Sequence, residues 1–191
     1  MQYTARDYAN VLKRWTRHYR IIRQFDTSLD IHATLLSWDF RWAYTVALSR
    51  WYRLTETEKK SMWARQQQDM DAAVEFIVAA VSSDNAWNDL EKGAPTPSAA
   101  PGETVKRSLW RVTLDVDALP PVLPLEIRVI EPISRLHRDM FPYIGFFHRL
   151  YLVRFPKDSI PEHARVIRLR FASSLGAGSL KWETTNVFVN P

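Results

Sequence analysis

The sequence predicts an α+β domain, in which a two-helix segment packs on a mainly antiparallel sheet or sandwich-like arrangement of strands. Several segments alternate apolar and polar residues with a period of two, which is typical of strands with one buried face. One segment instead repeats its apolar residues at helical spacing. The strands of the second half follow one another without crossover helices between them, which favours antiparallel pairing.

The composition predicts a single domain over residues 1–191. The chain has 191 residues, of which 46% are hydrophobic and 13% aromatic, so it can bury a substantial core. A stretch rich in Pro and Ala at about 93–102 predicts an exposed loop. A linker between domains is the alternative, but the strands expected before it need partners from the rest of the chain.

The first two segments differ in how clearly they can be interpreted. Residues 11–22 fit one helical stripe and one strand face equally well, so their structure stays open. Leu29–Leu35 alternates cleanly and predicts a strand.

Two consecutive helices are expected next. Ser37 is a candidate N-cap for an amphipathic helix that runs to Trp51. Thr55 and Glu58 have the spacing of a capping box, which predicts a second helix to about Asp71. Because the apolar face of the second helix is thin, we expect it on the outside of the fold.

Further strands complete the predicted sheet. Val74–Val81 predicts a buried strand, with continuation of the preceding helix as the alternative. A short helix is expected within 133–140, and a turn-rich connection over 173–178. The strands expected after the loop are Trp110–Val116, Leu125–Val129, Phe147–Phe155, Arg165–Phe171, and Ser179–Thr184 with Val187–Val189.

A row of arginines in the alternating segments is the main functional indication. The chain carries a formal net charge of +5, which suits nucleic acid, anionic lipid or an acidic partner. Cross-strand pairing with Asp115 and Glu126 on a solvated sheet face explains the same pattern. The residues of this candidate interaction surface are Arg111, Arg128, Arg168 and Arg170, with Arg149 as a further candidate.

The segment from Trp38 to Trp63 concentrates four tryptophans together with Arg41, Arg50 and Arg53. Core packing of the helix pair accounts for aromatic residues at helical spacing. The alternative is an aromatic–arginine patch for a partner protein, because Trp, Tyr and Arg dominate interface hot spots.

No local motif predicts catalysis, and we therefore expect a non-enzymatic protein without catalytic residues, cofactor or metal. The sequence contains no Cys and no G-x-S-x-G motif. It also lacks H-x-x-x-H spacing, although a metal site assembled only in three dimensions stays open. No window is long and apolar enough for a transmembrane segment. The five histidines are His18, His32, His137, His148 and His163.

The order of segments resembles a group of uncharacterised bacterial envelope proteins, many of them predicted lipoproteins. The matching segments are Arg14–Arg17, Phe25–Thr27, Ala33–Ser37 with Phe40–Arg41, Ser108–Leu114, Phe141–Pro142 and Tyr151–Pro156. The resemblance implies a place at the cell envelope and no catalytic residue. The chain departs from the group because it shows neither a signal peptide nor a lipid-bearing Cys, so membrane association would need a removed N-terminal anchor.

These observations together predict an interaction or structural domain at the bacterial cell envelope, with an unidentified protein partner. The alternative is a binder of nucleic acid or another anionic surface through the arginine-rich sheet face. We expect envelope localisation if an N-terminal export segment was removed, and cytoplasmic localisation otherwise.

Overall fold

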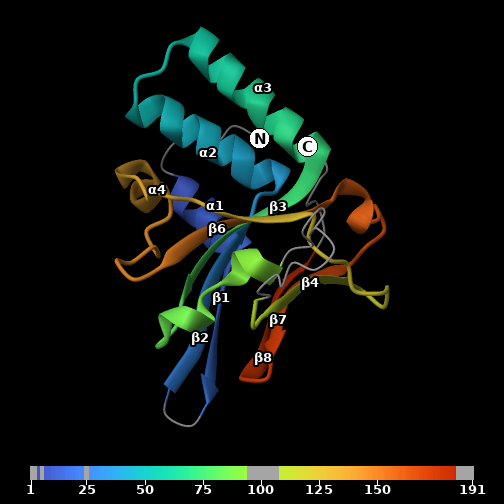
Figure 1. Cartoon of the computed structure of the whole chain (residues 1–191). Coiled ribbons are helices and arrows are strands. Elements are labelled where there is room, and N and C mark those ends of the chain that lie inside the picture. Colours follow the sequence, from blue (N-terminus) through green and yellow to red (C-terminus); the bar gives the residue numbers. More distant parts are fainter. Residues whose placement is uncertain (1–3, 5–6, 24–25, 94–107, 184–191) are drawn as a thin grey trace, which may run out of the picture.

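Two antiparallel sheets form the body of the molecule (Figure 1). The computed structural model describes residue 4 and residues 7–23, 26–93 and 108–183. The larger sheet has five strands in the order β1-β2-β3-β6-β5, and the smaller has three in the order β4-β7-β8. This arrangement confirms the predicted α+β class and antiparallel pairing.

The strands are β1 (Thr16–Arg23), β2 (Asp26–Leu35), β3 (Ala73–Val81), β4 (Arg111–Val116), β5 (Glu126–Val129), β6 (Arg149–Pro156), β7 (Val166–Ser173) and β8 (Gly176–Glu183). The helices are α1 (Tyr8–Trp15), α2 (Trp38–Trp51), α3 (Glu56–Ala72) and α4 (Arg135–Met140), with short 3₁₀ turns η1 (Asn85–Trp87), η2 (Leu90–Gly93) and η3 (Lys157–Ser159).

Aromatic side chains pack between the two sheets. The ring of Phe76 on β3 lies 5.3 Å from that of Trp182 on β8 and 5.9 Å from that of Phe155 on β6. All three side chains are almost completely buried. The Trp182 indole N–H also donates a hydrogen bond to the Trp15 carbonyl oxygen over 2.8 Å, which satisfies its buried donor. These contacts join the three-stranded sheet to the N-terminal part of the chain.

Both predicted helix caps are present. The Ser37 hydroxyl accepts from the Phe40 amide at the start of α2, and Thr55 and Glu58 form the capping box of α3. The two helices lie side by side at the top of Figure 1. None of the α3 residues is fully buried, as the thin apolar face predicts.

The structure decides between the alternatives that the sequence left open for two segments, residues 11–22 and 74–81. Residues 11–22 contain both structures, because α1 ends at Trp15 and β1 begins at Thr16. Residues 74–81 form the buried strand, which starts directly after α3.

A turn lies within the connection predicted over 173–178 but is shorter than predicted, because only Ser174 and Leu175 separate β7 from β8. The two glycines suggested a longer turn, yet Gly178 allows a close approach within a strand. A Cβ atom there would collide with the ring of Tyr19 on β1. Most of the predicted loop at about 93–102, and the predicted strand 187–189, lie outside the described residues.

Candidate functional site

The five predicted arginines are divided between the two sheets. Arg111, Arg168 and Arg170 alternate with buried residues on β4 and β7, and therefore point outward from the three-stranded sheet. Arg128 on β5 and Arg149 on β6 belong to the five-stranded sheet instead. The periodicity identified the outward positions but could not show that the strands belong to two sheets.

Three of these arginines are paired with carboxylates. Arg170 lies 3.9 Å from Asp115, and Arg128 lies 3.6 Å from Glu126. The exposed side chains leave such pairs little net stabilisation. Arg149 is less exposed, and its guanidinium lies 3.4 Å from Glu91 and 3.8 Å from Glu131. Within the described ranges, Arg111 and Arg168 make no ion pair. Pairing with carboxylates thus explains part of the arginine row, and the pair between Arg170 of β7 and Asp115 of β4 is cross-strand.

A second surface combines exposed aromatic rings with arginines. Trp51 at the end of α2 and the adjacent Tyr52 are 48% and 54% exposed. Phe146 and Phe147, in the segment between α4 and β6, are 91% and 85% exposed. The exposure of two adjacent phenylalanines costs hydrophobic free energy, and contiguous exposed apolar surface is a common feature of interaction sites. We call this the aromatic–arginine surface, and define it as Trp51, Tyr52, Arg135, Arg138, Phe146 and Phe147.

Helix α4 joins the two aromatic pairs of this surface. Its spacing puts Arg135, Arg138 and Asp139 on one side of the helix. The Arg138 guanidinium lies over the Phe146 ring, 5.8 Å from its centroid, at the distance of a cation–π contact. On the other flank, Arg135 and Asp139 line an open hollow of about 600 Å³ with Trp51 and Tyr52.

Buried contacts hold this surface in place. The Tyr8 hydroxyl donates to the Met140 carbonyl oxygen at the end of α4 over 2.8 Å. The Tyr8 ring also meets the Trp51 ring edge-on at 5.9 Å. Phe141, directly after α4, stacks on Phe40 of α2 with ring centroids 5.9 Å apart. The aromatic–arginine surface therefore rests on a packed support that links α1, α2 and α4.

The four tryptophans between Trp38 and Trp63 do not all have the same surroundings. Trp38, Trp42 and Trp63 pack against one another between α2 and α3, with centroid distances of 4.9 to 6.4 Å. Arg41 is buried against Glu75 of β3. Packing of the helix pair thus accounts for three of the four tryptophans, and only Trp51 lies on the aromatic–arginine surface.

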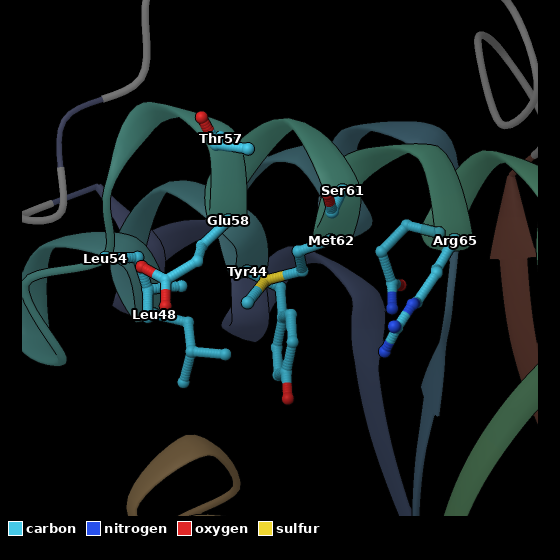
Figure 2. A pocket seen from close by; sticks show the side chains of 9 residues that line it. Tyr44, Leu48, Leu54, Thr57, Glu58, Ser61, Met62 and Arg65 are labelled. Carbon is cyan, nitrogen blue, oxygen red and sulfur yellow. The ribbon is translucent and has the colours of Figure 1, made fainter.

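A cavity of about 470 Å³ lies between α2 and α3 (Figure 2). Figure 2 shows Tyr44, Leu48 and Met62 converging on it, with Glu58 toward one end and Arg65 toward the other. The Glu58 carboxylate is already engaged by the Thr55 backbone amide at 2.7 Å, and burial raises the pKa of Tyr44. The cavity therefore offers apolar volume and no acid–base pair.

Three histidines gather on the helix-facing side of the β1–β2 pair. His18 and His32 are direct cross-strand neighbours, and their rings stack with centroids 4.2 Å apart. Tyr143 stacks on the other face of His32 at 5.1 Å, and His148 meets His32 edge-on at 6.0 Å. The last two residues come from the segment between α4 and β6.

A buried carboxylate anchors this histidine cluster. One oxygen of Asp30 lies 2.6 Å from the His18 Nε2 atom, and the other accepts from the Arg20 Nε–H over 2.7 Å. Burial alone would raise the pKa of Asp30, but the hydrogen bonds from His18 and Arg20 outweigh it and lower the pKa. Asp30 is therefore an ionised acceptor at neutral pH.

Burial shifts the titration of two histidines in this cluster, His32 and His148. Burial, followed by the proximity of His18, lowers the pKa of His32 to about 4. Burial also lowers the pKa of His148. Local spacing could not reveal this cluster, because its members come from two strands and a later segment. The signal in the sequence is the i, i+2 pairs His18/Arg20 and Asp30/His32, which share one face once the strands pair.

Comparison with known proteins does not identify a family. No family model matches the sequence, and no curated protein does. A crystal structure of a protein of unknown function from Burkholderia pseudomallei K96243 superposes with a TM-score of 0.42 and 11% sequence identity, over 95% of this chain and 90% of that chain. At this score the likeness supports no conclusion about function.

Proposed function

We propose that the protein is a non-enzymatic interaction domain that docks onto an anionic phospholipid surface through its aromatic–arginine surface. The observation that carries the proposal is the nearly complete exposure of Phe146 and Phe147 beside Arg138. Apolar rings favour the boundary between acyl chains and headgroups, and each nearby arginine adds attraction to anionic lipid. The net charge of +5 acts in the same direction.

The aromatic residues of this surface belong to the types that occur at membrane–water interfaces, which supports a lipid surface as the occupant. The two phenylalanines lie in a connection after a short helix, whereas Trp51 and Tyr52 lie at the end of another helix. Trp and Tyr are enriched at membrane–water interfaces, where one side of the ring is apolar and the other wet. None of the described helices is long and apolar enough to cross a bilayer.

Vesicle co-sedimentation tests this function. The full chain is mixed with vesicles containing about 30% phosphatidylglycerol, or with pure phosphatidylcholine vesicles. We expect binding to the anionic vesicles, at least ten-fold weaker binding after Phe146→Ser/Phe147→Ser, and weakening by salt. The matched control is Leu119→Ser/Leu125→Ser, which removes two exposed leucines elsewhere. Equal binding by the phenylalanine and leucine variants, or none by the wild type, would contradict the proposal.

A second candidate surface lies on the three-stranded sheet. Arg168 and Arg170 line a hollow of about 270 Å³ with Tyr19 and Ser179, where a nucleic-acid phosphate could be bound. Asp115 in the same hollow opposes an anion. The test is fluorescence anisotropy with single-stranded DNA at low salt, in which Arg168→Gln weakens any binding by this surface. An unchanged affinity would exclude the site.

A further inference from the structure

We propose that His18, Asp30 and His32 form a binding site for a divalent transition cation of the zinc type. The candidate ligand atoms of these three side chains all lie within 4.8 Å of one another. The described ranges contain no other group of three histidine or carboxylate side chains that meets this spacing. The site lies on paired strands, so the backbone fixes the relative positions of the residues that carry the ligands.

The donor set determines the class of ion. Two imidazole nitrogens and one carboxylate oxygen suit zinc and its neighbours, with a fourth tetrahedral position left for water. Magnesium and calcium prefer shells of oxygen ligands alone. The cluster therefore selects for a borderline transition cation.

A hydrogen bond already brings two of the three ligand atoms together. The His18 Nε2 atom lies 2.6 Å from one Asp30 oxygen. A cation bound by both atoms takes the place of the hydrogen between them. When the His18 ring ligates through Nε2, its own hydrogen lies on Nδ1.

The surroundings of Asp30 and His32 suit a site that binds its ion reversibly. Arg20 holds the second Asp30 oxygen over 2.7 Å, which directs the first oxygen toward the His18 Nε2 atom, the neighbouring ligand. The positive charge of Arg20 also lowers the affinity for a cation. The His18 side chain is 45% exposed and gives the ion access. The His32 ring must turn about its Cβ–Cγ bond, out of the stack, to aim its lone pair.

His148 offers a further polar group beside the proposed site. Its Nδ1 atom accepts from the Gly145 amide over 3.0 Å, so the neutral ring carries its proton on Nε2. That Nε2 atom is buried and has no hydrogen-bond partner in the described part of the chain. A buried donor without a partner is costly. It lies beside the His32 ring, where a water in the fourth position of the ion can accept its hydrogen bond.

Cobalt(II) absorption and zinc calorimetry on the untagged full chain test the site. We expect one equivalent of Zn²⁺ to bind, and Co²⁺ to give the visible absorption of a four-coordinate ion. Asp30→Asn and His32→Gln should each weaken binding at least ten-fold, because each removes a ligand. His163→Gln removes an exposed histidine elsewhere and serves as the matched control. Circular dichroism verifies that each variant is folded.

Nitrogen-15 spectra of the histidine rings test the site in the wild-type chain, so this result does not depend on whether a variant folds. Zinc should shift the resonances of His18 and His32 in the wild-type chain and leave those of His163 unchanged. The proposal is overturned by the absence of saturable binding up to about 1 mM zinc. Equal affinity in the His32→Gln and His163→Gln variants, or ring shifts confined to other histidines, would overturn it as well.

Discussion

The guanidinium of Arg41 on α2 and the carboxylate of Glu75 on β3 form an ion pair of 2.6 Å, with 2% and 6% of the side chains exposed. The remaining donors of Arg41 reach the Leu36 carbonyl and the Gln66 amide oxygen. The other Glu75 oxygen lies 2.8 Å from Arg154 of β6. This buried network joins both long helices to the centre of the five-stranded sheet.

Removing the Glu75 charge should be costly. Glu75→Gln leaves Arg41 buried without its counter-charge, and we expect the free energy of unfolding to fall by about 3 kcal/mol. Urea denaturation measures the change. Glu183→Gln, which removes the partner of the exposed Lys181, should change stability by less than about 0.5 kcal/mol. Similar values for the two variants would show that the Arg41–Glu75 pair does not hold the helices on the sheet.

The N-cap of α2 should contribute measurably to stability. Ser37 is fully buried and accepts from the Phe40 amide over 3.2 Å. Ser37→Ala leaves this amide without its acceptor, so we expect a loss of about 1 kcal/mol in thermal unfolding. Ser61→Ala, at an exposed site inside α3, should be neutral or slightly stabilising, because Ala favours helix. A cap variant as stable as the Ser61 variant would refute the capping role.

Stability should fall as the pH is lowered through the titration range of His32. Its pKa is lowered from 6.5 in the unfolded chain to about 4 in the fold, so the unfolded state takes up the proton first. The stabilisation is therefore complete above about pH 6.5 and lost progressively toward pH 4. Because the ring is half-buried, we expect about 1–2 kcal/mol after allowance for solvent screening.

Several titratable groups surround His32 and enter this pH dependence. His18 stacks on one face, Tyr143 on the other, His148 meets it edge-on, and Asp30 is close by. Denaturation between pH 7 and pH 4 should show a smaller decline in His32→Gln than in the wild type. His137→Gln is the comparison, because its pKa is also lowered by burial but it lies on α4. A decline unaffected by His32→Gln would contradict this assignment.

Local patterns predicted the elements well, because the caps at Ser37 and Thr55 and the alternation of each strand depend on neighbouring residues. The grouping of strands into two sheets depends on long-range packing such as Phe76 on Trp182, which periodicity does not encode. The same limit applies to the sites. Phe146 and Phe147 are hydrophobic, so the sequence alone suggests that they are buried, whereas the structure exposes them. The histidine cluster forms only when β1 pairs with β2, and local spacing does not predict that pairing.

The depth of Phe147 in a bilayer tests the proposed docking most directly. Because the sequence contains no Cys, Phe147→Cys provides a single site for an environment-sensitive nitrobenzoxadiazole label. Ile22→Cys, at a residue 61% exposed on β1, is the control. In Figure 1 the β1–β2 hairpin extends to the bottom, away from α4. Anionic vesicles should brighten and blue-shift the label at position 147 and leave the label at position 22 unchanged. No change at position 147, or a larger change at position 22, would contradict docking through the aromatic–arginine surface.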